Sequence, residues 1–415
     1  MERRDFLTGL IATPALAAVG CAGAALEGSN PTGAVPMSPD APEGARASHE
    51  ALRDLIDALS ALESSWVQAP ARGHDPYGFS DGYRNLMHSL EDGLLRAFEA
   101  DPEWPVFQRM VTPTRKYLGD NPDAIYFSAF VRGGRRYRIR GNLAGAVYTS
   151  FTLEYGDEGS TISKGVASVL NDSEFEVETD GSYEILLSPT EEPGHRGWLE
   201  LPPNAMQITT RHYFERERSA AADPSVEIPL VIEPLDAPAP PPTFDDARVA
   251  AGMRRVIEQL NWKAAMAPPP GERPMPAWVG TTPNIFPTPS APGDIAYTAL
   301  DASYTMAPYS LGPDEALVMT GRFPKCRFAN VVLWNAHNMT YDYAHRPTSR
   351  NRKQTKLEAD GSFRMVLAHR DPGVPNWIDT EGRPSGMVFW RFFLPDEQPV
   401  TPRAEVVPFD AVRAR

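Results

Sequence analysis

Three stretches of the chain carry apolar residues at the three- and four-residue spacing of a helix. The first stretch holds Leu52, Leu55, Ile56, Leu59, Leu62 and Trp66. The second covers residues 81–99, and the third holds Val249, Met253, Val256, Ile257 and Leu260. This spacing places the apolar side chains on one face and predicts amphipathic helices. We expect a helical segment at residues 48–118, and a third helix, capped by Thr243 and Asp246, within a Pro-rich linker at residues 236–291.

The remainder of the chain contains short β-branched and aromatic runs, and these runs occur twice. The segment Asp180–Leu187 (DGSYEILL) matches Asp360–Leu367 (DGSFRMVL). The same offset in residue number aligns Val147–Leu153 with Arg327–Leu333. Because this constant offset is far longer than the period of a solenoid, it indicates duplication of a whole domain.

The two copies predict the fold class. Each has several short strand-like runs separated by turn signals, such as the Asp-Gly-Ser sequence quoted above. We therefore expect a mainly β fold with accessory helices, of the α+β class. Two tandem jelly-roll-like β-sandwich domains, at residues 119–235 and 292–415, are preceded by the helical segment.

The first residues of the chain have the features of an export signal. Arg3-Arg4 is followed by Phe6-Leu7 and then by a short apolar stretch that Pro14 interrupts. This pattern predicts a twin-arginine signal peptide at residues 1–24 and a periplasmic or envelope-anchored protein. Cys21 follows small residues, so either lipidation of Cys21 or plain cleavage after an alanine fits. A flexible tether at residues 25–47 comes next, and membrane contact is expected only through the signal peptide or a lipid anchor.

Charge and cysteine content exclude several function classes. The formal net charge of −14 argues against nucleic-acid binding, because a phosphate backbone requires a basic surface. Apart from Cys21 the chain has only Cys326, so we expect no internal disulfide. No cofactor fingerprint and no metal-ligand spacing is present in the sequence. We therefore expect no cofactor and no metal.

Several longer motifs resemble those of a bacterial family known as domain of unknown function 1214. They are Pro113-Thr-Arg-Lys116, Gly119-Asp-Asn-Pro-Asp123-x-x-Tyr126, Trp334-Asn335, Thr340-x-Asp342-Tyr343, Arg346, Asn351-Arg352-x-Gln354, Asn376-Trp377-Ile-Asp379-Thr, Gly386 and Arg391. The resemblance covers most of the chain from about residue 50. It implies a β-sandwich fold in exported or envelope-associated proteins, and it implies no established reaction.

The loop after Trp334 in the second copy concentrates polar and aromatic chemistry. Residues 335–354 hold two His, two Tyr, one Asp and three Arg, whereas the equivalent stretch of the first copy, Tyr155–Glu174, has no His and no Arg. Because only one copy carries these groups, the loop is a candidate ligand site on a rigid β scaffold. The alternative is a surface or inter-domain loop whose arginines pair with acidic residues elsewhere.

A Trp-x-acid…Arg arrangement occurs in both copies, as Trp198, Glu200 and Arg211 and as Trp377, Asp379 and Arg391. It either presents an Arg and an aromatic ring to a ligand or forms a structural ion pair beside a core Trp. With the loop, it completes the candidate ligand-binding set: Tyr341, Arg346, Arg350, Arg352, Trp377, Asp379 and Arg391.

These observations support three functional hypotheses. The first is a binding protein whose second β domain holds a glycan or another polar, anionic small molecule. The second is a lyase or hydrolase, with His337 or His369 as the base and Asp342 or Asp371 as its partner. The third is a structural envelope protein without a ligand. An oligomer is compatible with all three.

Overall fold

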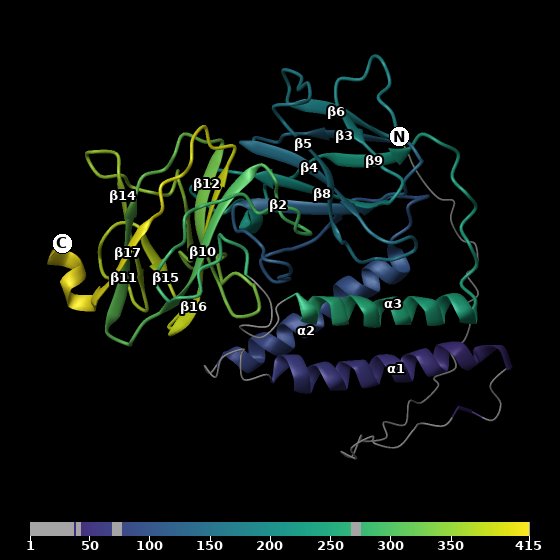
Figure 1. Ribbon diagram of the computed structural model, residues 1–415, viewed down its shortest axis with the longest axis horizontal. Coiled ribbons are helices and arrows are strands. Elements are labelled where there is room, and N and C mark those ends of the chain that lie inside the picture. Colours follow the sequence, from purple (N-terminus) through teal and green to yellow (C-terminus); the bar gives the residue numbers. More distant parts are fainter. Residues whose placement is uncertain (1–36, 39–42, 69–76, 267–274, 415) are drawn as a thin grey trace, which may run out of the picture. The chain divides into compact units, whose positions relative to one another are not determined.

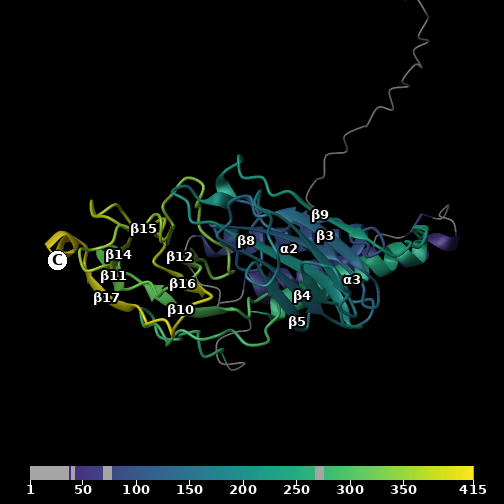
Figure 2. The ribbon, with the colours of Figure 1, turned by 90° about the horizontal axis from the view of Figure 1, so that it is seen from above.

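The computed structural model describes residues 37–38, 43–68, 77–266 and 275–414 (Figures 1 and 2). The predicted signal peptide and Cys21 lie outside the described residues. Within those described ranges, no helix is long and apolar enough to cross a membrane.

Three helices form a separate apolar cluster. They are α1 (Arg46–Leu62), α2 (Gly78–Leu94) and α3 (Asp246–Ala265), and α1 and α2 are extended by π turns at Glu63–Val67 and Leu95–Glu99. Short 3₁₀ helices lie at Glu43–Ala45, Ala220–Ala222 and Phe409–Ala414. The apolar faces of the three helices pack together around Leu55, Leu86 and Val256.

The cap of α3 differs from the predicted one. Asp245 is the N-cap, and its carboxylate accepts a hydrogen bond from Arg248 N (2.8 Å). Asp246 instead accepts hydrogen bonds from the backbone N–H groups of Ala47 (2.9 Å) and Ser48 (3.1 Å). The predicted partner of Thr243 therefore ties the start of α1 to the start of α3.

The first copy is a sandwich of two sheets. One sheet has the strand order β1-β2-β8-β4-β5 and the other the order β7-β6-β3-β9. The strands are β1 (Gln108–Arg109), β2 (Ala124–Phe130), β3 (Tyr137–Asn142), β4 (Tyr148–Tyr155), β5 (Gly165–Asn171), β6 (Ser182–Ser188), β7 (Trp198–Glu200), β8 (Ala205–Tyr213) and β9 (Leu230–Pro234).

The second copy repeats this order, apart from the short strand β1, as β10-β16-β12-β13 and β15-β14-β11-β17. Its strands are β10 (Ala302–Ser310), β11 (Glu315–Gly321), β12 (Phe328–Trp334), β13 (Ser349–Asn351), β14 (Phe363–Ala368), β15 (Trp377–Asp379), β16 (Ser385–Phe393) and β17 (Arg403–Pro408). Even the parallel pair recurs, since β6 with β7 corresponds to β14 with β15. The predicted mainly β fold with two tandem β domains is confirmed.

Each copy has a core between its two sheets. Phe151, Ile185 and Ile208 lie in the first core, and Val331, Met365 and Trp390 in the second. The opposite faces of β4, β8, β12 and β16 are also buried, in part because the two copies pack against each other there. Arg96 of the helical segment covers another part of this face and donates to Gln207 on β8. Tyr213 contacts both Phe328 and Phe393 at this interface, with ring centroids 4.7 and 4.5 Å apart.

The polar contacts between the copies are reciprocal. Asp123, just before β2, accepts a hydrogen bond from Asn351 Nδ2 in the second copy (2.8 Å). Asp301, just before β10, accepts one from Asn171 Nδ2 in the first copy (3.2 Å). The two asparagines are equivalent, since Asn171 ends β5 and Asn351 ends β13. The two copies thus dock through equivalent surfaces, as the subunits of a two-fold dimer do.

The equivalent arginines Arg211 and Arg391 also make reciprocal contacts between the copies. Arg211 donates hydrogen bonds to the carbonyls of Tyr297 (3.0 Å) and Thr298 (3.2 Å), in the segment that enters the second copy. Arg391 donates to the carbonyl of Gly119 (3.2 Å), in the segment that enters the first copy. In each copy, this arginine therefore binds the segment that leads into the other copy.

Candidate functional site

Of the four arginines predicted to bind a ligand in the second copy, the three in the loop all hold partners within the chain. Arg346 forms an ion pair with Asp379 (2.8 Å), and Arg350 donates to the carbonyl of Trp377 (2.7 Å). Arg352 forms an ion pair with Glu215 of the first copy (2.5 Å). The contacts of Arg346 and Arg352 match the alternative in which the loop arginines pair with acidic residues elsewhere.

The remaining predicted ligand-binding groups are also engaged. The hydroxyl of Tyr341 lies 2.7 Å from that of Tyr309. Arg391 lies over the rings of Trp334 and Phe389, with its guanidinium carbon 4.9 and 4.2 Å from the two centroids. Since the carboxylate of Asp379 bonds to Arg346, the Trp-x-acid…Arg arrangement is not one ion pair, and Arg391 acts in inter-copy packing.

The four residues predicted for acid–base catalysis lie in different environments. His337 is buried, with its ring edge-on to Trp66 and their centroids 5.9 Å apart. Asp342 is partly exposed and bonds to His345 Nδ1 (2.9 Å). Asp371 accepts a hydrogen bond from a backbone N–H two residues on (2.7 Å).

His369 has both ring nitrogens occupied. Nε2 faces the carbonyl of Gly312 (3.2 Å), which can only accept, so Nε2 carries the proton. Nδ1 then accepts a hydrogen bond from the hydroxyl of Thr380 (2.6 Å). A base needs a free lone pair directed at its substrate, and this arrangement provides a structural hydrogen-bond bridge instead.

Several motifs behind the family resemblance converge on one buried junction. Lys116 Nζ donates to the hydroxyl of Thr340 (2.6 Å), lies 3.5 Å from the carboxylate of Asp120, and sits 3.7 Å from the centroid of Tyr343. The indole N–H of Trp334 donates to the carbonyl of Asp120 (2.9 Å). Burial lowers the pKa of Lys116, and the nearby Asp120 carboxylate partly opposes that shift. The junction joins the helical segment to both copies.

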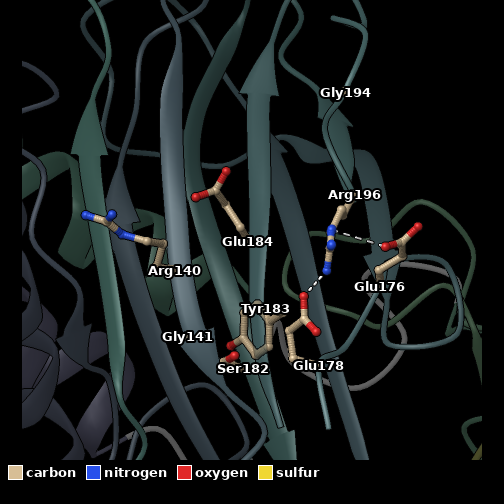
Figure 3. Close-up of a pocket in the computed structure, with 9 residues that line it drawn as sticks. All are labelled: Arg140, Gly141, Glu176, Glu178, Ser182, Tyr183, Glu184, Gly194 and Arg196. Atoms are coloured by element: carbon tan, nitrogen blue, oxygen red, sulfur yellow. Dashed lines mark ion pairs between the residues drawn. The ribbon is translucent and has the colours of Figure 1, made fainter. Parts of the chain in front are cut away.

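A pocket of about 400 Å³ opens on the first copy, where the sequence had predicted no site (Figure 3). Five charged residues line it: Arg140 on β3, Glu184 on β6, Glu176 and Glu178 in the segment before β6, and Arg196 before β7. Figure 3 shows Arg196 placed between Glu176 and Glu178, and it forms an ion pair with each, the former at 3.3 Å.

The paired charged side chains that line this pocket are more than half exposed. The side chains of Arg196, Glu176 and Glu178 are 55%, 68% and 53% exposed. Exposed ion pairs contribute only about 0–1 kcal/mol, so a ligand can exchange these bonds at little cost. The site is therefore able to offer both donors and acceptors to a polar molecule.

Tyr183, which lines the pocket, differs from its second-copy equivalent Phe363 by one hydroxyl group. The ring of Tyr183 lies against Gly141, where an added Cβ would collide with the Tyr hydroxyl. The equivalent pair in the second copy is Phe363 against Gly321. Among the described residues, no hydrogen-bond partner exists for the Tyr183 hydroxyl, and burial raises the pKa of Tyr183.

In the second copy, the residue equivalent to Glu184 makes a different contact. Arg364 replaces Glu184, and it donates to the carbonyl of Val412 (2.9 Å) in the 3₁₀ helix at Phe409–Ala414. Val412 packs against Val366 and Val407 in a small apolar cluster. A partial sequence signal for the pocket is the charge difference between the copies at two strand positions, Arg140 against Thr320 and Glu184 against Arg364.

No group of three or more His, Cys, Asp or Glu side chains that could hold a metal ion occurs in the part of the chain that the structure describes. Cys326 is half-buried, and burial raises its pKa to about 11, so its thiol stays protonated at neutral pH.

The comparisons with known proteins agree with the duplicated fold. The model of a family described as "Protein of unknown function (DUF1214)" matches residues 128–216 and 314–397, one region in each copy. This confirms the family resemblance for those two regions. No curated protein matches the chain.

Solved structures similar to this chain include the following two. An uncharacterized protein from Burkholderia cenocepacia is 29% identical, with 88% of this chain and 98% of that chain covered and a TM-score of 0.73. A protein from Vibrio parahaemolyticus is 13% identical, with 78% of this chain and 98% of that chain covered and a TM-score of 0.45.

Proposed function

We propose that this is an exported, periplasmic or envelope-anchored protein that binds a neutral glycan or a similar polyhydroxylated molecule in the pocket of its first β domain. The observation that carries the proposal is the open pocket of about 400 Å³ lined by charged side chains of both signs. Its size is within the usual range for a small-molecule site.

The charge balance of the lining favours a neutral ligand. Three carboxylates, of Glu176, Glu178 and Glu184, and two guanidinium groups, of Arg140 and Arg196, line the pocket, a formal balance of −1. Arg140 also pairs with Glu233 beside the pocket (2.9 Å). An anionic ligand would meet this excess of negative charge. A pair of sugar hydroxyls can instead donate to a carboxylate and accept from a guanidinium, and both of these groups have planar, two-point geometry.

The proposal moves the ligand site from the second copy to the first. The cations of the second-copy loop already bind Asp379, Glu215 and the carbonyl of Trp377. The ion pair with Glu215 also helps to hold the two copies together, so a ligand that displaced it would weaken the inter-domain contact. The exposed pairs of the first-copy pocket carry no such cost.

A thermal-shift screen followed by calorimetry tests the proposal. Neutral and acidic glycans and simple polyols would be screened against the wild-type protein and against Glu178→Gln, Glu184→Gln and Glu358→Gln variants. Glu358 is the second-copy equivalent of Glu178 and provides the matched control. We expect a neutral glycan to raise the melting temperature of the wild type. The same glycan should bind about tenfold more weakly to each pocket variant, as expected for loss of a charged hydrogen bond, and normally to the control.

A screen in which no neutral glycan shifts the protein would overturn the proposal. So would a shift that both pocket variants retain in full, because it would place the binding site elsewhere.

A further inference from the structure

One carboxylate that lines the pocket of the first copy, that of Glu184, has only distant partners (Figure 3). The cationic groups that approach it are Arg138 Nε at 3.6 Å and His195 Nδ1 at 3.9 Å. Both distances exceed the usual length of a hydrogen bond, about 2.7–3.2 Å. Since the side chain of Glu184 is 41% exposed, a ligand in the pocket can reach its oxygens without displacing a hydrogen bond made by the described residues.

The arginines on the strand beside Glu184 are paired with another carboxylate. Arg140 forms an ion pair with Glu233 on β9 (2.9 Å), and Arg138 also approaches Glu233 (3.4 Å). These two guanidinium groups therefore share one carboxylate outside the pocket in addition to their proximity to Glu184.

The third guanidinium group of the pocket, that of Arg196, lies between two carboxylates. It forms ion pairs with Glu176 and with Glu178. When Arg138 and Glu233 are counted with the lining, three guanidinium groups meet four carboxylates, and one negative charge is left without a cation. An additional cation is therefore better accommodated here than an additional anion.

The acidic character of the pocket is particular to the first copy. At the offset that relates the copies, the equivalents of Glu176, Glu178 and Glu184 are Lys356, Glu358 and Arg364. Arg364 has a backbone partner, the carbonyl of Val412 (2.9 Å). Because the shared fold does not require carboxylates at these positions, their presence in the open pocket points to a role in ligand binding.

A second polar group at this pocket is also without a partner. Tyr183 lines the pocket and is only 4% exposed, and its hydroxyl has no hydrogen-bond partner in the part of the chain that the structure describes. An unpaired buried hydroxyl is unfavourable, so packing alone would favour phenylalanine, the residue found at position 363 in the second copy. This observation does not depend on the charges, and it too indicates a pocket adapted to a polar ligand.

We propose that the pocket binds a glycan with a free, protonated amine more tightly than its neutral counterpart, and that the carboxylate of Glu184 is the partner of the amine. The inference rests on the proposed function, because the hydroxyls of such an amino sugar bind the pocket as those of a neutral glycan do. When an ammonium group donates to a carboxylate both partners are charged, whereas a hydroxyl is a neutral donor. The ammonium group also supplies the positive charge that the lining lacks.

Isothermal titration calorimetry with two matched disaccharides tests this inference. Cellobiose is the neutral ligand, and deacetylated chitobiose has the same linkage with an amine in place of one hydroxyl on each ring. Both are titrated at a pH at which the amines are protonated. We expect chitobiose to bind the wild-type protein about tenfold more tightly than cellobiose, as a charged hydrogen bond provides.

Glu184→Gln, Glu178→Gln and Glu358→Gln variants assign the preference to one residue. Glutamine at position 184 can still bind hydroxyls but carries no charge, so the ratio of the two affinities should fall to about one. The ratio should stay at about tenfold in Glu178→Gln, because Glu178 is paired with Arg196, and in the second-copy control Glu358→Gln. Each ratio compares two ligands on the same protein, so partial unfolding of a variant leaves it unchanged.

Failure of this inference is distinguishable from failure of the proposed function. Equal binding of the two disaccharides by the wild type, or a preference for chitobiose that Glu184→Gln retains, would overturn the inference while glycan binding in the pocket stands. Binding of neither disaccharide would overturn the inference as well, and the wider glycan screen described above then decides whether the proposed function also falls.

Discussion

Replacing Glu154 with glutamine should change how the stability of the protein depends on pH. Glu154 lies on β4, next to the segment that enters the second copy, and is fully buried. One carboxylate oxygen accepts hydrogen bonds from the hydroxyl of Ser163 (2.7 Å) and the backbone N–H of Tyr297 (3.4 Å). The other oxygen has no hydrogen-bond partner in the described part of the chain. Glutamine can keep the two accepted bonds and removes only the ionisable group.

The magnitude follows from the pKa of Glu154, which burial raises from 4.5 to about 7 despite the nearby charge of Arg211. Since the folded protein binds this proton more tightly than the unfolded chain, Glu154 contributes stability that is fully present below pH 4.5 and is lost as the pH rises through about 7. At about 1.4 kcal/mol per pKa unit, the loss amounts to about 3 kcal/mol.

Other buried groups titrate in the same range, so the comparison must be between the two proteins at each pH. Burial raises the pKa of Asp123 to about 6, which gives the same sign as Glu154. Burial lowers the pKa of His212 to about 3, so His212 contributes stability that is lost as the pH falls below 6.5. Both groups remain in the Glu154→Gln variant, and their contributions cancel in the difference.

Urea unfolding of both proteins at pH 5, 6, 7 and 8 measures this difference. We expect the variant to gain about 2–3 kcal/mol relative to the wild type between pH 5 and pH 8. A Glu200→Gln variant, altered at an exposed position of the same copy, should follow the wild type at every pH. Parallel pH profiles for the Glu154→Gln variant and the wild type would refute the reasoning.

Three further predictions concern other parts of the chain. Gly119 has φ of +77°, and an added Cβ would meet the ring of Trp334 at 2.6 Å, so Gly119→Ala should lower the free energy of unfolding by more than about 1 kcal/mol in urea titrations. Arg346 is 52% exposed but its partner Asp379 is only 5% exposed, so Arg346→Ala removes the charged donor of a buried carboxylate and should lower that free energy by about 1–3 kcal/mol; no measurable loss would contradict this reasoning. Changing Arg3 and Arg4 to lysine should retain the protein in the cytoplasm of a twin-arginine-competent host, and normal export of that variant, measured by cell fractionation, would contradict the predicted signal.

The fold could be predicted because its signals are local or repeated. The turn at Asp180 is an example: Ser182 N donates to the Asp180 carboxylate (2.9 Å), and Gly181 has φ of 85°. The same turn recurs at Asp360, where Ser362 N donates at 2.9 Å. Such turns depend on neighbouring residues only, so a sequence that contains them twice at a fixed offset indicates two copies of one domain.

The candidate site could not be predicted in the same way, because whether a charged side chain is available to a ligand depends on which other charged side chains the fold places beside it. The loop at residues 335–354 is rich in cations, and its composition alone is compatible with a ligand site. Arg352, however, pairs with Glu215, 137 residues earlier in the chain. The charge that neutralises a side chain lies on another segment, and only folding brings the two segments together.

Sequence patterns alone predicted the three helices, the mainly β class, the duplication and the equivalence of positions in the two copies, because helix periodicity, strand alternation and turn chemistry are short-range properties. They were not sufficient to show that Arg352 of the second-copy loop pairs with Glu215 of the first copy, or that a pocket opens on the first copy. Arg140, Glu178 and Arg196 come from three separate segments and have no common sequence pattern. They form one site because the sheet pairs β3 with β6 and the loops beside these strands fold toward them. Proximity of this kind follows from the packing of the whole chain.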